Sequence, residues 1–219
     1  MRKKFLYIAY FYPPISAIAS MRSWKLVKYI REYGWDPIVL AADTDDREWR
    51  TPLPEVPVYR VDGTPFLGRL TQKIKRKTNP QSKDVNGVGK KCSGMFFSGV
   101  FFRGARFLKG CLNEVFAYPD VYRRWQKNAL HAARQIVVER DIDLILSTSG
   151  PYSSHIVASK LHRETMIPWI ADYRDLWTQN GYEEHLCLRL FFERKLERLA
   201  LTSAAEVVTV SEPLAKRLE

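Results

Sequence analysis

The sequence contains no long apolar run. Its apolar stretches fall well short of the ~20 residues that a membrane-spanning helix needs. The first of them, 5–12, is short and lacks the small-residue cleavage site of a signal peptide. We therefore expect a protein that stays in the cytoplasm.

Cysteine is scarce as well. Cys92, Cys111 and Cys187 form no CxxC pair, and no histidine follows any of them at metal-ligand spacing. Three scattered cysteines are typical of reduced thiols and not of a disulfide framework. We expect no metal site.

Two phosphate-binding signatures are missing. No G-x-G-x-x-G follows the first predicted strand, so we expect no dinucleotide cofactor. The stretch 87–91, Gly-Val-Gly-Lys-Lys, resembles part of a phosphate loop, but Asp84 stands where that motif needs its upstream glycine, and no strand precedes it. We expect no bound cofactor of either kind.

Acidic residues are rare in the middle of the chain. The stretch 63–124 holds 13 Lys and Arg against three Asp and Glu, and so carries nearly all of the net charge of +11. Such a segment favours an anionic partner, either a phospholipid surface, a nucleic acid or a phosphorylated ligand. No recognised nucleic-acid motif accompanies the charge, so we expect no nucleic-acid partner. A basic membrane-binding or nucleic-acid-binding module stays open as an alternative function.

What is present is typical of one folded domain. With 219 residues, 46% of them hydrophobic and 27% charged, the chain is long enough for one large core. Apolar runs and helical periodicities alternate in the order strand, helix, strand, which predicts an α/β domain with a parallel sheet. The predicted strands are 5–10, 37–42, 56–61, 144–147, 169–171 and 206–210, and the predicted helices are 20–33, 121–139, 153–163, 183–201 and one that starts near 211.

A basic, Phe-rich insert at 64–116 interrupts this alternation. Its first part shows no steady period, whereas 96–116 is amphipathic, and Arg103, Arg106 and Lys109 supply its charge. The residues that can share its apolar helical face are Phe97, Phe101, Leu108, Leu112 and Val115. Such a segment either attaches the protein to an anionic membrane or packs its phenylalanines inside the protein. The sequence leaves both open.

Ligands of parallel α/β sheets bind beyond the carboxyl ends of the strands, so three loops are of interest. The first, 11–20, contains Pro13-Pro14 and leads into a helix for which Ser20 is the predicted N-cap. Arg22 lies in the first turn of that helix, where a cation opposes the helix dipole unless an anion is bound nearby. The alternative is a rigid connector followed by a solvated arginine.

The second loop, 147–154, gathers hydroxyl groups around a Gly-Pro turn. Ser153 or Ser154 would cap the following helix, and the hydroxyls would bind sugar or phosphate. His155 lies at the start of that helix, either as a site residue or as a structural one. The other histidines, His131, His162 and His185, fall inside helical patterns and are interpreted as structural.

The third loop, 172–178, places two carboxylates around a guanidinium, with Asp172, Arg174 and Asp175 followed by Trp177. Charges at the end of a buried strand need partners. They form an ion-pair network that fixes the loop, contact a ligand, or do both.

These runs resemble the family 4 glycosyltransferases. Tyr10-Phe-Tyr-Pro-Pro14 with Arg22 is similar to the start of that family, and Ser147-Thr-Ser-Gly-Pro-Tyr-Ser-Ser-His155 with Pro168-Trp-Ile-Ala-Asp-Tyr-Arg-Asp175 is similar to its "TSPPxSSH … PWxxDxRD" run. Val208 to Glu212 is similar to its "VTxVSE". The resemblance covers about 1–62 and 118–219 and leaves the insert without a counterpart.

The resemblance implies a GT-B enzyme. Such enzymes have two Rossmann-like domains, and each domain is a parallel sheet with helices on both faces. The two domains hold an acceptor and a nucleotide-sugar donor between them. The reaction needs no metal ion and retains the anomeric configuration of the sugar. The whole chain, 1–219, would be the N-terminal, acceptor-binding domain, without the C-terminal, donor-binding one. The resemblance implies a catalytic role for His155 and a binding role for Pro14, Ser16, Ala17, Arg22, Ser149, Gly150, Ser153, Asp172, Arg174 and Asp175.

One position departs from the family. Many members have a glycine pair in the first loop, whereas this chain has Ala17-Ile-Ala19, and a Cβ there narrows the approach of the backbone to a phosphate. We expect an enzyme that moves a sugar from a nucleotide-sugar to a lipid-linked or cell-envelope glycan acceptor. We expect it to lie at the inner face of the cytoplasmic membrane as a peripheral protein, with the insert 64–116 on the anionic lipid surface. A nucleotide-sugar epimerase of the same shape is the alternative.

Overall fold

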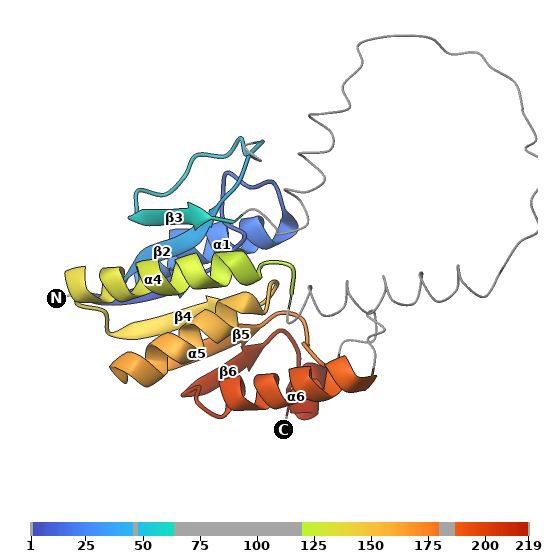
Figure 1. Ribbon diagram of the computed structural model, residues 1–219. Coiled ribbons are helices and arrows are strands. Elements are labelled where there is room, and N and C mark those ends of the chain that lie inside the picture. The colour runs from blue at the N-terminus through green and yellow to red at the C-terminus, as the bar shows by residue number, and fades with distance from the viewer. Residues whose placement is uncertain (1, 46–47, 64–119, 180–186, 219) are drawn as a thin grey trace, which may run out of the picture.

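The computed structural model describes residues 2–45, 48–63, 120–179 and 187–218. The predicted insert at 64–116 and the residues Cys92, Cys111 and His185 lie outside this described part. Figure 1 shows one sheet with helices packed against it.

The centre of the protein is a six-stranded parallel sheet in the order β3-β2-β1-β4-β5-β6. Its strands are β1 (Lys3–Ile8), β2 (Trp35–Asp43), β3 (Val58–Asp62), β4 (Leu144–Thr148), β5 (Trp169–Tyr173) and β6 (Glu206–Thr209). The chain first winds outward from β1 to β3, returns to β4 beside β1, and then winds outward on the other side. This is the doubly wound order of Rossmann-like sheets, and it confirms the predicted fold class.

Helices cover both faces of the sheet. They are α1 (Ile18–Tyr29), the 3-10 helix η1 (Ile30–Tyr33), α4 (Arg123–Glu139), α5 (Ser153–Thr165), α6 (Cys187–Leu201) and α7 (Glu212–Leu218). In Figure 1, α4, α5 and α6 lie side by side in front of the sheet and α1 lies behind it. Right-handed crossovers produce this division, because the chain moves in one direction from β1 to β2 and in the other from β4 to β6. None of the described helices is both long and apolar enough for a membrane span.

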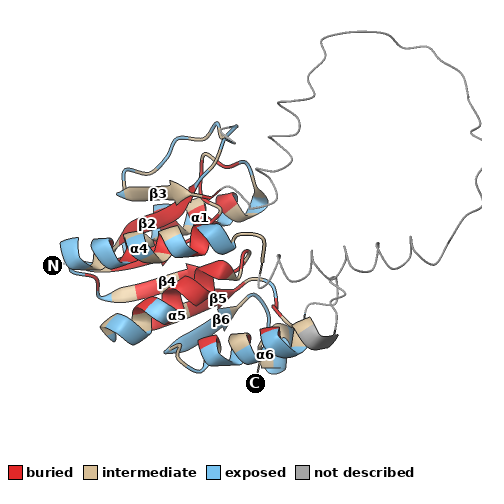
Figure 2. Cartoon of the chain, in the orientation of Figure 1, coloured by how far each residue is buried: buried red, intermediate tan, exposed pale blue. Residues whose placement is uncertain are grey.

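Alternation along the central strand supplies two cores. Leu6 and Ile8 of β1 belong to the larger cluster, which includes Trp125 of α4. Phe5 and Tyr7 point the other way, into the smaller cluster that α1 closes. Figure 2 shows the central strands buried and the outward sides of the helices exposed. Burial on both faces explains why these strands are continuous apolar runs in the sequence.

Three local predictions can be compared with the structure. The predicted N-cap Ser20 is wrong, because α1 begins at Ile18 after the extended residue Ala17, and Ser20 is buried within the helix. Gly34 ends η1 as predicted, with a φ of 83° that suits glycine. The fifth strand, β5, reaches Tyr173, so Asp172 lies within β5 and not in the loop after it.

Tyr10 organises the edge of the sheet where β1 ends. Its hydroxyl donates a 2.6 Å hydrogen bond to the carbonyl of Gly63, which follows β3. Its ring lies 4.2 Å, centroid to centroid, from the ring of Tyr122 at the start of α4, and 5.3 Å from that of Trp125. Tyr10 therefore contacts the residues on both sides of the segment 64–119.

Candidate functional site

The site lies where the strand order reverses, between β1 and β4. The loops that follow these two strands lead to helices on opposite faces, so they diverge at the carboxyl edge of the sheet. In doubly wound sheets the space between such loops is the crevice in which ligands bind. Three segments meet there: the loop 9–17 with the start of α1, the loop 149–152, and the end of β5 with residues 174–178. We call this region the switch-point site.

The centre of the switch-point site is an ion pair between α1 and β5. Arg22 donates two hydrogen bonds to the carboxylate of Asp172, from Nη2 to Oδ1 at 2.7 Å and from Nε to Oδ2 at 3.3 Å. Thr148, the last residue of β4, donates a third to Oδ2 at 2.8 Å. The carboxylate is buried and fully engaged, whereas the arginine side chain is 42% exposed. Its Nη1 has no partner in the described chain and is available to an anion.

The loop after β4 is held against the residues after β5. The Ser149 hydroxyl accepts hydrogen bonds from the backbone N–H groups of Arg174 and Asp175, at 2.9 and 3.3 Å. Arg174 and Asp175 form a second two-contact ion pair, with Nε and Nη2 within 2.8 and 2.7 Å of Oδ2. A Cβ built on Gly150 would lie 3.4 Å from Nη2 of Arg174, so the guanidinium rests close to this glycine. The Gly150–Pro151 bond is cis.

The first loop presents the start of α1 to the same crevice. Pro13 and Pro14 are joined by a cis bond, and Arg60 of β3 donates a hydrogen bond to the carbonyl of Pro13. Neither a side-chain cap nor an acidic residue occupies the first turn of α1, and its N-cap is Ala17. Ser16 is exposed at this end of the helix. The first turn of α1 thus supplies no anion of its own to the positive end of the helix dipole.

An apolar side chain stands at the same place. Ile18, the first residue of α1, is 91% exposed. An exposed isoleucine leaves a hydrocarbon surface at the start of α1.

His155, for which the sequence predicts a catalytic role, is buried beneath the surface of the switch-point site, and that role stays a prediction. The ring is fully buried and stacks on Tyr173, with centroids 4.4 Å apart. Its Nδ1 lies 2.7 Å from the hydroxyl of Ser147, which also accepts a hydrogen bond from the indole of Trp169. Burial lowers the pKa of His155 to about 3, so the ring is neutral near pH 7. Its contacts with Ser147 of β4 and Tyr173 of β5 hold these two strands together.

Ser153, for which the sequence predicts a binding role, contacts a protein carboxylate, and its binding role stays a prediction. Ser153 is fully buried, and both its N–H and its hydroxyl donate to the carboxylate of Asp120, at 2.8 and 2.7 Å. Asp120 also accepts from the N–H of Tyr122 at 2.9 Å. A protein carboxylate therefore occupies the start of α5, where the sequence suggested a ligand.

Sequence reasoning missed three contributors. Thr148 was read only as part of a hydroxyl-rich loop, although its place as the last residue of β4 puts it beside Asp172 of β5. Asp120 precedes α5 by 33 residues, and no local pattern reveals that it caps this helix. Tyr152 stacks on Trp177 at 4.9 Å with an interplanar angle of 3° and so fixes the loop after β5. Only Thr148 was open to prediction, from strand register.

The structure thus brings most of the predicted residues together. Arg22, Asp172, Ser149, Gly150, Arg174 and Asp175 are joined by direct contacts or lie next to them, and Pro14, Ser16 and Ala17 belong to the loop that leads into α1. His155 and Ser153 lie beneath this surface. Within the described ranges, no group of three or more His, Cys, Asp or Glu side chains is placed to hold a metal ion.

The strand order, with its reversal between β1 and β4, defines a doubly wound α/β domain. The model of the glycosyl transferase 4-like domain matches residues 102–219, more than half of the chain. The chain belongs to this family, which confirms the resemblance stated from its motifs. The match begins within the predicted insert and leaves residues 1–101 outside it.

Two other comparisons add little to the family assignment. The crystal structure of MurG from Acinetobacter baumannii is similar over 95% of this chain and 41% of that one, with 14% identity and a TM-score of 0.43. The chain thus spans less than half the length of that protein. A search of curated proteins found no match.

Proposed function

We propose that this chain is the N-terminal, acceptor-binding half of a GT-B glycosyltransferase that moves a sugar from a nucleotide-sugar to a lipid-linked or cell-envelope glycan acceptor, with retention of configuration. Family membership supports glycosyl transfer in general. The observation that supports the rest best is the Arg22–Asp172–Thr148 network at the reversal of the strand order.

The charges of this network suit a donor diphosphate. Asp172 holds the Nε and Nη2 edge of Arg22, which leaves Nη1 directed away from the carboxylate. Arg174 is held in the same manner by Asp175. A guanidinium held on one side has little rotamer entropy left to lose when an anion binds on the other. In this proposal both arginines, with the start of α1, stabilise the negative charge that builds on the leaving nucleotide.

The neighbouring surface suits an acceptor with an apolar part. The hydroxyl of Ser16 and the exposed side chain of Ile18 lie at the same end of α1, so a hydroxyl-bearing acceptor would find both a hydrogen-bonding group and a hydrocarbon contact. This combination favours a lipid-linked acceptor over a purely polar one. A location on the inner face of the cytoplasmic membrane follows from such an acceptor, and the predicted membrane contact through 64–116 lies outside the described residues.

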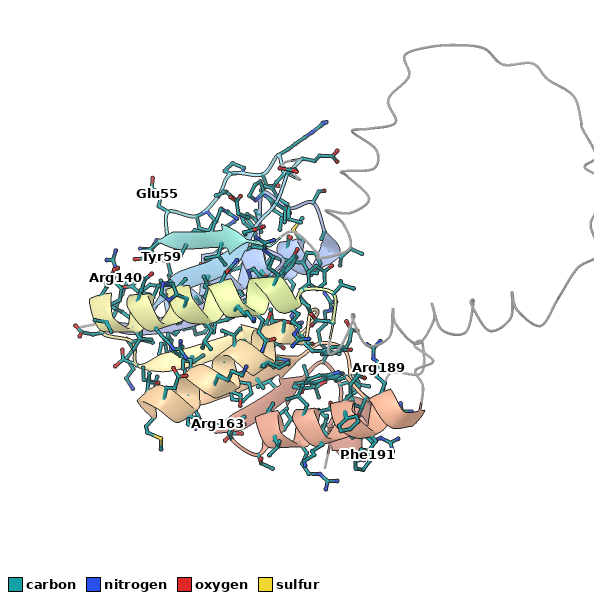
Figure 3. The ribbon with its side chains drawn as sticks, viewed as in Figure 1. Glu55, Tyr59, Arg140, Arg163, Arg189 and Phe191 are labelled. Atoms are coloured by element: carbon teal, nitrogen blue, oxygen red, sulfur yellow. The ribbon has the colours of Figure 1, made fainter. Side chains whose placement is uncertain are left out.

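The test is a transfer assay with the full-length protein. Radiolabelled UDP- and GDP-sugars are incubated with a membrane lipid extract, and label that enters the organic phase measures transfer. Arg22→Ala is expected to lower transfer at least tenfold. The matched control is Arg140→Ala, which removes an exposed arginine with a single 3.3 Å hydrogen bond, to Tyr59, at the opposite edge of the sheet (Figure 3).

The products separate this proposal from its alternative. Sugar joined to a lipid or glycan, with the anomeric configuration of the donor by NMR, supports a retaining transferase. A free nucleotide-sugar with an altered sugar would instead identify an epimerase. Equal transfer by the Arg22 and Arg140 variants would remove the switch-point site from the reaction.

A further inference from the structure

A pocket that borders the switch-point site at Thr178 is lined by three arginines without acidic partners in the described part of the chain. It lies between α6, the C-terminal end of α7 and the residues after β5, and has a volume of about 760 Å³. Arg194 and Arg198 of α6 and Arg217 of α7 line it. None of the three forms an ion pair in the part of the chain that the structure describes. Three unpaired guanidinium groups around one pocket repel one another unless an anion joins them.

One acidic residue lines this pocket, and it does not neutralise the arginines. Glu197 is buried and uses Oε2 to accept hydrogen bonds from the hydroxyl and the N–H of Thr178. Burial raises the pKa of Glu197, which favours its uncharged form. Its Oε1 has no hydrogen-bond partner within the described chain. The pocket therefore keeps a positive charge and an unsatisfied polar atom.

The outer face of α6 continues this pocket as a basic and apolar surface. Phe191, Phe192 and Leu199 are 63%, 50% and 49% exposed, and Phe191 lies on the outer side of the helix in Figure 3. Lys195 is exposed between Arg194 and Arg198.

Both acidic residues of α6, Glu193 and Glu197, are buried, so between residues 189 and 201 the exposed side chains of this helix are cationic or apolar. This composition complements an anionic lipid surface and is poorly suited to water.

We propose that the arginine pocket and the outer face of α6 bind an anionic phospholipid surface. A headgroup phosphate enters between Arg194, Arg198 and Arg217, while Phe191, Phe192 and Leu199 contact the acyl chains next to it. Arg194 and Arg198 belong to both the pocket and the helix, so one lipid layer engages both. This contact is separate from the proposed sugar transfer and does not depend on it.

Vesicle flotation of the full-length protein tests the proposal. Vesicles of phosphatidylcholine alone are compared with vesicles that also contain phosphatidylglycerol, and the wild type is expected to float with the second kind. Each cation near an anionic surface contributes about 1 kcal/mol, so R194Q/R198Q is expected to weaken binding about thirtyfold. The matched control K25Q/K127Q removes two exposed lysines from α1 and α4 and is expected to show no such loss when measured beside it.

Two further variants separate the pocket from the helix face. R217Q removes a pocket arginine that is not on α6, and a loss of binding with it supports the insertion of a headgroup into the pocket. F191S/F192S removes the apolar contact and is expected to lower binding while leaving the salt dependence unchanged. Circular dichroism of each variant shows whether it is folded.

Three results would overturn the proposal. R194Q/R198Q that floats like the wild type would remove the pocket from membrane binding. Equal flotation with vesicles of phosphatidylcholine alone would remove the role of anionic lipid. Binding of glycerol phosphate in solution, lost in R217Q, together with no flotation, would identify a free phosphate compound as the ligand and not a membrane.

Discussion

Arg22 and Asp172 form a two-contact ion pair although 150 positions separate them in the sequence. The pair joins the helix after the first strand to the fifth strand across the crevice at the centre of the sheet. Because Asp172 is buried and Arg22 is partly exposed, the carboxylate fixes the arginine in place, and the arginine presents its free edge to solvent.

Asp172→Asn is expected to lower both stability and transfer. An amide offers one acceptor oxygen in place of two, so it cannot hold Arg22 and Thr148 together. Because the position is buried, losing these hydrogen bonds is expected to lower the free energy of unfolding by about 1–2 kcal/mol. Urea denaturation and the transfer assay measure the two effects. Asp36→Asn is the matched control, since Asp36 pairs with Arg2 and Arg31 at an exposed position and its loss is expected to cost under about 0.5 kcal/mol. Unchanged transfer in Asp172→Asn would contradict the proposed role of the pair.

The buried ring of His155 is expected to make the protein less stable in acid. Its pKa is about 3 in the folded state, against 6.5 for an ordinary histidine. Below pH 6.5 the unfolded chain takes up a proton that the folded protein excludes, so stability falls with the pH, with a slope that approaches about 1.4 kcal/mol per pH unit.

His155→Gln provides the measurement, because glutamine does not titrate. We expect the variant to be less stable by about 1–3 kcal/mol at pH 7, because it loses the stacking on Tyr173. The difference between wild type and variant is expected to shrink as urea denaturation is repeated from pH 7 down to pH 5. A difference that stays constant over this range would show that the ring is protonated in the folded protein.

Asp120→Ala is expected to destabilise the protein by about 1–2 kcal/mol, since Asp120 caps the start of α5. Burial raises the pKa of Asp120, so its charge contributes less than its geometry. Asp120→Asn keeps the acceptor oxygen and is expected to retain more than half of the stabilisation. Thermal unfolding of both variants checks this order, and equal losses would show that the charge is what matters.

Gly63→Ala is expected to cost about 1–3 kcal/mol through overpacking. A Cβ at this position would lie 2.5 Å from the Cβ of Ala42 and 3.2 Å from the ring of Tyr10. Gly34 gives the comparison, because it has open space around it but a φ of +83°. Gly34→Asn is expected to cost less than about 1 kcal/mol, since asparagine tolerates this conformation. Denaturation that ranks Gly34→Asn below Gly63→Ala in stability would overturn the packing argument.

The order of the elements was predictable because the central strands β1, β2, β4 and β5 are largely buried and the helices packed on them, such as α4 and α5, have buried apolar residues at helical spacing. Such segments leave a local pattern, as in the runs around Leu6 and Leu146. Their ends were less predictable. Ser20 has the right residue type for a cap but is buried inside α1, and β5 extends to Tyr173 because its pairing with β6 continues through Thr209.

The site was predictable in outline because the carboxyl ends of parallel strands share one edge, which brings Arg22, Ser149 and Asp172 into one region. The roles of individual residues were not. Whether His155 faces the crevice or the core depends on the rotation of α5 about its axis, and that rotation is set by long-range packing against Trp169 and Tyr173. The cap from Asp120 is likewise a contact between distant segments.

The contacts of Tyr10 bear on how this protein tolerates variation in length. The chain leaves the sheet at Gly63 and rejoins it before Tyr122, and one tyrosine side chain contacts both residues. A connection whose two ends are already held together adds only about 0.6 kcal/mol of closure entropy for each doubling of its length. Insertions and deletions between these two points are therefore inexpensive for folding, and related proteins are free to differ widely there while the strands on either side keep their positions.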